Sequence, residues 1–330
     1  MTRVKIGILS FAHMHAYSYA DALAKHPDVE FVGIVDADDT RGRSAAEQFN
    51  TKYFTSEREL FVQDLDGVIV TSENIHHHTL VALAAQSGVR AILCEKPLAT
   101  TIDHAKQMIS LCAARNVKLA TAFPCRYSPA FKQLCTNVWT GAIGDVLAIC
   151  ATNRGSMPGG WFIDKTLAGG AAVIDHTVHV ADLNRVLLRT EAETVYAEIH
   201  NGFNHEDWED TGFLSISYAN GIVASLDTSW SRPKSYPTWG DVTMQVVGTC
   251  GILNLDMFAQ NLVHYSAKGK GEWINFGSDT DAGLVSDFIH LASGDDAPHI
   301  ATGEDGLHAL SVAIAAYESA AKGQPAKAHL

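Results

Sequence analysis

The 330-residue chain has few charged residues, few cysteines and no long hydrophobic run. A membrane-spanning helix needs about 20 apolar residues, and no uncharged stretch reaches that length, so we expect no membrane partner. The six cysteines form no CxxC pair and lie mostly in apolar runs, as is typical of reduced thiols. The opening MTRVKIGIL lacks the pattern of a secretory signal. We therefore expect a cytoplasmic protein.

Positive charge is scarce as well. The 24 Lys and Arg residues face 37 Asp and Glu residues, for a net charge of −13, and no basic run stands out. An acidic surface repels phosphate backbones, which excludes nucleic acid as a general partner. Hydrophobic residues make up 47% of the chain, enough for a sizeable core. The length predicts two domains.

The first third of the chain alternates buried-strand patterns with helical patterns. Strands are expected at residues 4–9, 31–35, 67–70, 91–94 and 117–122. Continuous apolar strands separated by helices predict a doubly wound parallel sheet, and so an α/β domain over residues 1–123. From residue 194 to 276 short alternating runs replace the helices. They predict a large, mostly antiparallel open sheet within an α+β domain over residues 124–330.

Glycine is missing where a dinucleotide-binding turn would need it. A GxGxxG motif after the first strand would place its glycines at the positions of Ser10, Ala12 and His15. Ser10 and Ala12 are still small enough for close approach of a phosphate, and His13 and His15 can hydrogen-bond to it. The other interpretation is an ordinary strand–turn–helix connection with incidental histidines.

Polar residues follow the next strands of the predicted parallel sheet. Asp36 is placed to accept hydrogen bonds from the ribose hydroxyls of NAD, and its charge would repel the extra phosphate of NADP. The run His76-His77-His78 cannot direct three side chains at one metal ion, because neighbours on a helix point about 100° apart. We interpret this segment as lining a cofactor. Lys96 follows Glu95 at a buried strand end, where a lysine can donate a proton or hold a negative charge.

One expected helix, over residues 172–188, places Asp175 and His179 four residues apart on one face. Asp182 lies on the same side. A carboxylate and an imidazole together form a plausible acid/base pair. A capping Asp beside a core histidine is an equally good interpretation, and an Asp/His metal site is a third.

Several segments resemble the Gfo/Idh/MocA oxidoreductase family nearly end to end. They are CEKPLA at the fourth strand end, KIGILSFAHMH, IVDAD, VIVTSENIHH, TAFPCRYSPAF, AGGAAVIDHTVHVAD and TGEDGLHALSVAIAAYESAAKGQP. The combination of the motifs CEKP and DxxxHxxD is specific to this family. The chain departs from the family pattern at the three glycine positions, and at Glu73, Pro124 and Ala171. The missing glycines are explained either by a serine- and histidine-bearing turn or by loss of cofactor binding.

The resemblance implies an N-terminal Rossmann domain and NAD(P)-dependent oxidation or reduction of a sugar, cyclitol or related polyol. It implies that Lys96, Asp175 and His179 line the substrate. We expect His179 to accept the hydroxyl proton, Lys96 to stabilise the oxygen and Asp175 to orient the substrate. The expected cofactor-binding residues are Ser10, Phe11, Ala12, His13, Met14, Asp36, Thr71, Ser72, Asn74, His77, Glu95 and Lys96. The expected substrate residues are Lys96, Arg126, Tyr127, Trp161, Asp175, His176 and His179.

The resulting prediction is an NAD-dependent dehydrogenase, with NADP the less favoured cofactor and no metal. Its expected partners are a small polyol substrate and further copies of the chain, in a homodimer or homotetramer joined through the C-terminal sheet. Two other hypotheses remain open. One is a glycosidase that holds NAD and cleaves by transient oxidation and elimination, and the other is a non-catalytic nucleotide- or sugar-binding regulator.

Overall fold

The computed structural model describes residues 3–259, 261–265, 271–275, 277–328 and 330. The chain divides into two compact units. Unit 1 comprises residues 1–124, 166–169 and 280–310, and unit 2 comprises residues 125–165, 170–279 and 311–330. The sequence-based division into residues 1–123 and 124–330 assigned segments 166–169 and 280–310 to the second domain, whereas the structure groups them with unit 1.

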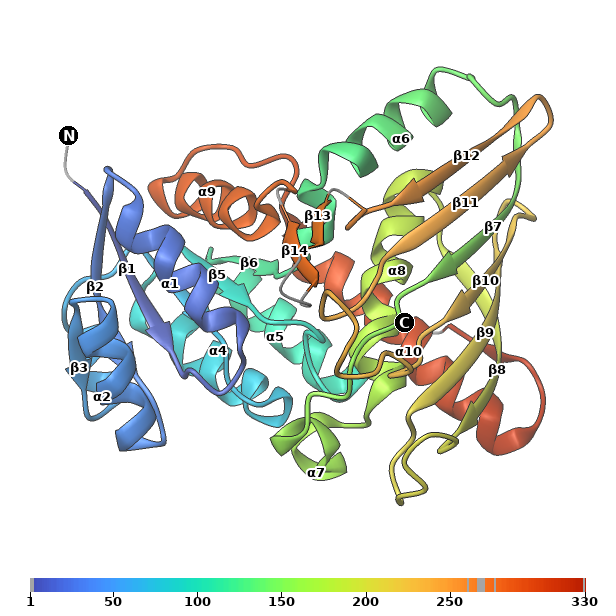
Figure 1. The fold of residues 1–330 in the computed structure, drawn as a ribbon. Coiled ribbons are helices and arrows are strands. Elements are labelled where there is room, and N and C mark those ends of the chain that lie inside the picture. Colours follow the sequence, from blue (N-terminus) through green and yellow to red (C-terminus); the bar gives the residue numbers. More distant parts are fainter. Residues whose placement is uncertain (1–2, 260, 266–270, 276, 329) are drawn as a thin grey trace. The chain divides into compact units, whose positions relative to one another are not determined.

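Unit 1 is built on a seven-stranded sheet whose strand order is β15-β6-β5-β4-β1-β2-β3 (Figure 1). All neighbours pair in parallel except β15, which adds an antiparallel edge strand. The strands are β1 (Val4–Leu9), β2 (Val29–Val35), β3 (Lys52–Phe54), β4 (Gly67–Val70), β5 (Ala91–Cys94), β6 (Lys118–Thr121) and β15 (Ala301–Thr302). The chain order reverses at β1, so the switch point of this sheet lies beside the end of β1.

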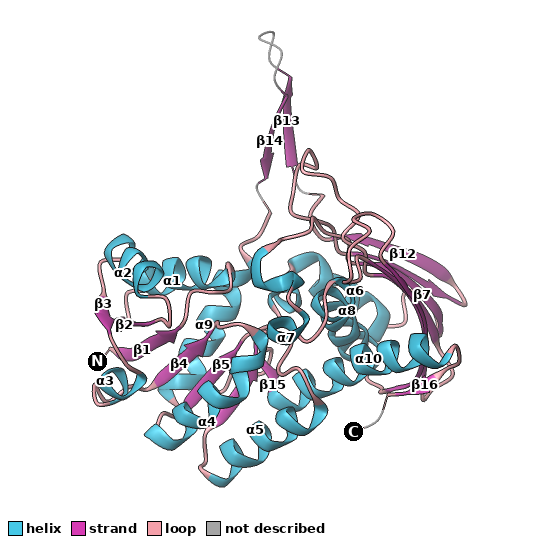
Figure 2. Ribbon diagram, turned by 90° about the horizontal axis from the view of Figure 1, so that it is seen from below, coloured by secondary structure: helices cyan, strands magenta, loops and turns pink. Residues whose placement is uncertain are grey.

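The helices of unit 1 cover both faces of this sheet (Figure 2). They are α1 (His15–Lys25), α2 (Asp39–Gln48), α3 (Glu57–Phe61), α4 (His77–Ser87), α5 (Ile102–Ala114) and α9 (Thr280–Ser293), with a 3-10 turn at Asn74–His76. Strands β4 and β5 are buried at every residue, as a sheet covered on both faces requires. The five predicted strands of this region and the alternation of strands with helices are confirmed, but β3 and α3 lacked a recognisable pattern because they are short.

Unit 2 contains a second seven-stranded sheet of order β12-β11-β7-β10-β9-β8-β16. Only β7 and β10 pair in parallel, which confirms the mostly antiparallel prediction. The strands are β7 (Val146–Thr152), β8 (Ala192–His200), β9 (Thr211–Tyr218), β10 (Val223–Asp227), β11 (Thr243–Gly248), β12 (Gly251–Asp256) and β16 (Ala326–Lys327). Strands β13 (Asn261–Tyr265) and β14 (Gly271–Asn275) form a separate two-stranded ribbon (Figure 2).

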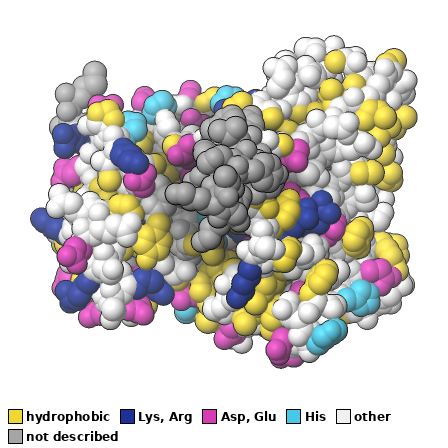
Figure 3. Space-filling model, in the orientation of Figure 1, with side chains coloured by type: hydrophobic (Ala, Val, Ile, Leu, Met, Phe, Trp, Pro, Cys, Tyr) yellow, Lys and Arg dark blue, Asp and Glu magenta, His cyan; other side chains and the backbone are white. Residues whose placement is uncertain are grey.

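The main helix of unit 2 is α8 (Ala172–Leu188), whose residues are mostly buried. The other helices here are α6 (Pro129–Trp139) and α7 (Lys165–Ala168), which reaches into segment 166–169, with 3-10 turns at Pro124–Tyr127 and Gly160–Ile163. Helix α10 (Gly303–Lys322) belongs to unit 1 as far as Leu310 and then to unit 2. Among the described residues, none of the helices has the length and apolar character needed to span a bilayer. On the face seen in Figure 3, Lys and Arg side chains are interspersed with acidic ones.

Candidate active site

The turn after β1 keeps the backbone form of a dinucleotide-binding turn without glycine. Ser10 has a φ of 75°, in the left-handed region that favours glycine. Two hydrogen bonds hold it there: Ser10 Oγ accepts from the Ala12 N–H at 3.1 Å, and the Thr71 hydroxyl donates to the Ser10 carbonyl at 2.6 Å. The substitutions in the turn therefore leave the sharp bend in place.

The residues that follow Ser10 in the turn differ in how far their side chains are exposed to a ligand. The Phe11 side chain is buried against Tyr17 and Phe49, so only its backbone can meet a ligand. His13 is also buried, whereas Met14 is 55% exposed. The cofactor-binding roles assigned to Phe11 and Met14 stay predictions.

Asp36 ends β2 and lies beside the same turn. Its carboxylate accepts the Phe11 N–H at 2.6 Å, the Asp38 N–H at 2.8 Å, and two bonds from the Arg41 guanidinium at 2.9 and 2.6 Å. The Asp36 side chain is fully buried. Its hydrogen bonds to Arg41 stabilise the charged guanidinium and so raise the pKa of Arg41 above its usual value. Gly42 permits this approach of α2, since a Cβ there would lie 2.8 Å from the Asp36 Cβ.

A pocket of about 190 Å³ opens at the carboxyl ends of β1, β2 and β4. Ser10, Asp36 and Ser72, all expected from the sequence to bind a cofactor, are part of its lining together with Glu73 and His76. This is where doubly wound sheets bind nucleotides, at the switch point outside the strand ends. The position and the polar lining fit the adenosine end of a dinucleotide.

Other predicted cofactor residues brace the loops around this pocket. The His77 ring lies between two main-chain carbonyls, with Nδ1 3.0 Å from the Pro97 oxygen and Nε2 3.2 Å from the Ser72 oxygen. Burial lowers the pKa of His77, and the neutral ring can donate its single N–H to only one of these two carbonyls. The Asn74 amide donates to the Ala168 carbonyl at 2.9 Å. These contacts position the backbone at the end of the sheet.

Glu95 is fully buried at the end of β5 and carries a charge. Burial opposes its ionisation, but His13, His15 and Lys96 hold the pKa of Glu95 well below its usual range. The carboxylate accepts the Lys96 N–H at 2.9 Å and the Tyr19 hydroxyl at 2.6 Å, and His15 Nδ1 lies 3.0 Å away. Lys96 itself is 4% exposed and precedes a cis proline. The Glu95 network thus fixes the backbone that carries Lys96.

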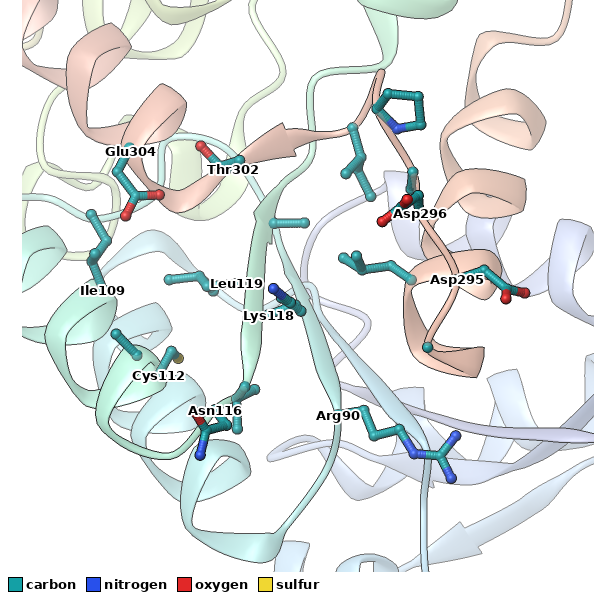
Figure 4. Close-up of a pocket in the computed structure, with 18 residues that line it drawn as sticks. Arg90, Ile109, Cys112, Asn116, Lys118, Leu119, Asp295, Asp296, Thr302 and Glu304 are labelled. Atoms are coloured by element: carbon teal, nitrogen blue, oxygen red, sulfur yellow. The ribbon is translucent and has the colours of Figure 1, made fainter.

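A larger pocket, of about 1060 Å³, lies elsewhere in unit 1 (Figure 4). Arg90 directly precedes β5, and Lys118 is the first residue of β6. Both line this pocket, so it lies at the amino ends of these parallel strands. Asp295, Asp296 and Glu304 also line it. Because doubly wound sheets bind ligands at the carboxyl ends, this pocket is a poor candidate for the cofactor site.

In unit 2 the structure brings Asp175 and His176 together with two tryptophans. The Asp175 carboxylate accepts a hydrogen bond from Trp230 Nε1 at 3.3 Å, and His176 Nε2 lies 3.3 Å from the same oxygen. The ring of Trp239 lies 6.0 Å from that of His176. His176 fits because residue 155 is glycine: a Cβ there would lie 2.6 Å from the imidazole.

His179 occupies the next turn of α8 and is 5% exposed. The start of α8 is held by Glu209, which accepts the Ala171 N–H at 2.6 Å, and by the Tyr317 hydroxyl, which accepts the Ile174 N–H at 3.2 Å. This fixes the first turns of the helix, on which Asp175 and His179 share a face.

The remaining predicted substrate residues behave differently from one another. Arg126 forms a bidentate ion pair with the fully buried Asp182, at 2.7 and 2.5 Å. This pairing favours a structural role for Arg126, and its substrate contact stays a prediction. Tyr127 is buried. Trp161 packs against an apolar cluster that includes Trp208 and Trp230, with its ring stacked on Phe162 at 3.9 Å.

The predicted cofactor set omitted two residues near the strand ends, although the sequence had indicated His15 as a possible phosphate ligand. Arg41 is bound to Asp36, and His15 is bound to Glu95. A signal for Arg41 was present in the sequence, because it follows an expected ribose-binding acid by five residues. His15 had a weaker signal, since its partner is 80 residues away in the chain.

Comparison with known proteins agrees with this geometry. Residues 4–123 match the family model for an oxidoreductase family with an NAD-binding Rossmann fold, and residues 131–254 match the GFO/IDH/MocA C-terminal domain. The fold and the first match together define an NAD-binding oxidoreductase. The chain belongs to the Gfo/Idh/MocA family, since the two models cover more than half of it.

The similar proteins include enzymes of sugar and cyclitol metabolism. The chain is 27% identical to 1,5-anhydro-D-fructose reductase from Ensifer adhaerens, over 90% of this chain and 91% of that one. It is 24% identical to myo-inositol 2-dehydrogenase from Thermotoga maritima, over 96% of each. The crystal structure of GenD2 from gentamicin A biosynthesis, in complex with NAD, superposes with a TM-score of 0.89 at 24% identity, covering 100% of this chain and 97% of that one.

Proposed function

We propose that the protein oxidises a CH–OH group of a sugar, cyclitol or related polyol, with NAD as the cofactor. The observation that carries the proposal is the placement of Asp175 and His179 four residues apart on one face of α8, in a chain whose other unit is an NAD-binding Rossmann domain. The names of the relatives, among them levoglucosan dehydrogenase and D-glucoside 3-dehydrogenase, support the sugar-like substrate.

Bound NAD supplies the acceptor for the hydride that leaves the carbinol carbon. The substrate hydroxyl must then lose a proton, and we assign that step to His179, because a neutral imidazole accepts a proton near pH 7. Lys96 stabilises the negative charge that develops on the oxygen. The assignment of both residues to one reaction rests on the family resemblance.

Asp175 orients the hydroxyl groups of the substrate. Its carboxylate accepts a hydrogen bond from Trp230 and lies beside His176, which fixes the position of one oxygen. The ring of Trp161 is only partly buried against the core cluster of Trp208 and Trp230, and its flat apolar face suits the C–H face of a sugar ring.

The test is a screen of polyols and aldoses that follows the formation of NADH, with His179→Gln and Lys96→Met compared on the best substrate. Each variant should lower kcat by about 100-fold or more, and His179→Gln should leave the Kd for NADH nearly unchanged. His200→Gln is a matched control, since His200 is exposed on β8 and has no assigned role.

Three outcomes would overturn this proposal. Full activity of both variants would remove His179 and Lys96 from the reaction. Release of a free sugar from a glycoside without net formation of NADH would instead establish a glycosidase. Binding of nucleotide with no turnover of any polyol would favour a regulator.

The proposal includes self-association through the sheet of unit 2. Large apolar side chains are exposed on its strands, including Leu147, Tyr196, Phe213, Val223 and Ile252. An exposed apolar sheet face favours a homodimer or homotetramer. Sedimentation analysis that finds only monomers at micromolar concentration would contradict this part.

A further inference from the structure

The turn before α1 uses most of its own backbone donors. The N–H groups of Phe11, Ala12, His13 and His15 donate to Asp36 Oδ2, Ser10 Oγ, the Thr71 carbonyl and His13 Nδ1, at 2.6, 3.1, 3.0 and 3.2 Å. In a glycine-rich turn such groups face the pyrophosphate. This turn therefore offers fewer backbone hydrogen bonds to a pyrophosphate, and another donor has to replace them.

His15 is the first residue of α1 and replaces the third glycine of the motif. Its Nδ1 lies 3.0 Å from the buried carboxylate of Glu95, which has no proton to give, so Nδ1 carries the hydrogen of that bond. The Nε2 nitrogen is the one left for a ligand. The side chain is 28% exposed, so a ligand at the helix N-terminus can reach it.

We propose that His15 binds the pyrophosphate of NAD: Glu95 holds the imidazolium through Nδ1, and Nε2 donates to a phosphate oxygen. The helix N-terminus and the imidazolium then act on the same anion. This inference depends on the NAD site and does not depend on the sugar substrate proposed above.

Charged groups around His15 decide whether it is protonated. Glu95 and Asp281 favour the imidazolium, and the latter is fixed by a hydrogen bond from Ser18 at 2.5 Å. Lys96 opposes it, and the His13 ring lies 4.3 Å from the His15 ring. Burial also opposes protonation, yet the Glu95 charge and hydrogen bond raise the pKa of His15 above its usual value.

The same three side chains, His13, His15 and Glu95, are close enough to suggest a metal site, with ligand atoms within 4.8 Å of one another. The hydrogen bonds argue against it. His13 Nδ1 accepts the His15 N–H and is therefore occupied, so a metal would have to displace a proton from the other ring nitrogen, Nε2. A metal-binding histidine instead donates a hydrogen from its second nitrogen. The cluster is better suited to an ion pair.

The consequence is a defined pH dependence of cofactor binding. Above the pKa of His15 the free protein must take up a proton to bind NAD, so Kd should rise about tenfold per pH unit. Below that pKa, Kd should be constant. The test measures the Kd for NADH by fluorescence titration across this range, without any sugar present.

His15→Gln should bind NADH roughly tenfold or more weakly at low pH and lose the pH dependence, because the variant loses a charge-assisted hydrogen bond. His290→Gln, at an exposed position on α9, is the matched control and should behave as the parent protein. A pH-independent Kd in the parent protein, or an unchanged Kd in His15→Gln, would overturn the proposal.

A second measurement needs no variant, in case His15→Gln fails to fold. Calorimetry of NADH binding in buffers of different ionisation enthalpy counts the protons taken up. We expect uptake approaching one proton above the pKa of His15, and zero uptake throughout would refute the proposal. Elemental analysis that finds one Zn²⁺ per chain, lost in His13→Gln and His15→Gln, would establish a metal site instead.

Discussion

Removal of the Arg41 side chain should change which cofactor the protein accepts. Asp36 was expected to exclude NADP by charge, but its carboxylate is paired with Arg41 and accepts four hydrogen bonds. A carboxylate offers about four acceptor positions, so Asp36 is saturated as it stands. The ion pair presents little net negative charge to a 2′-phosphate.

The magnitude follows from this geometry. In Arg41→Ala the Asp36 charge is left without its partner, close to the ribose. A unit charge about 7 Å from the phosphate contributes roughly 2 kcal/mol at an effective dielectric constant near 20. NADPH affinity should therefore fall about 30-fold. NADH affinity should change about threefold at most, because the acceptor positions freed on Asp36 become available to the ribose hydroxyls.

The assay is a fluorescence titration with NADH and with NADPH at the same ionic strength. Arg43→Ala is the matched control: Arg43 lies on the same helix, is 59% exposed, and stacks on Tyr53 with 4.6 Å to the ring centroid. It removes the same charge without unpairing Asp36. Equal losses of NADPH binding in the two variants, or none in Arg41→Ala, would refute this explanation of selectivity.

Two further predictions concern stability. Arg126→Leu should lower the free energy of unfolding by about 3–5 kcal/mol, measured by urea denaturation, because it leaves Asp182 buried and unpaired. Burial raises the pKa of Asp241, but hydrogen bonds from Thr152 and Arg232 lower it below the usual value of about 4. The ionised Asp241 carboxylate therefore stabilises the folded state at pH values above its usual pKa. This stabilisation is lost as the pH falls through the lower pKa that Asp241 has in the folded protein. In Asp241→Asn the unfolding free energy should depend less on pH in this acid range.

The elements of the fold were predictable because their signals are local. Buried strands such as β4 and β5 are short apolar runs, and turn residues bound them. Helix α8 was expected at the observed residues, which places Asp175 and His179 four residues apart on one face. The edge strand β3 has only three residues, none fully buried, so it has no periodic pattern to detect.

The state of each site residue depended on contacts that no local pattern encodes. That Asp36 is a candidate ribose ligand followed from its place after β2, but its saturation depends on where α2 begins and how Arg41 turns back. The ion pair of His15 with Glu95 joins two strand ends that are distant in the chain. Sequence spacing identified the chemical groups, whereas the partner of each group set its charge.

The glycine-free turn illustrates how one substitution requires others. A left-handed residue other than glycine costs about 1–2 kcal/mol, and the two hydrogen bonds at Ser10 contribute about 1 kcal/mol each, so serine can keep the bend. One of these bonds, however, uses the Ala12 N–H, which a glycine turn would direct at phosphate. The bend is therefore retained while part of its anion-binding capacity is lost. In our proposal, a histidine at the start of α1, held by a buried glutamate, makes up for this loss.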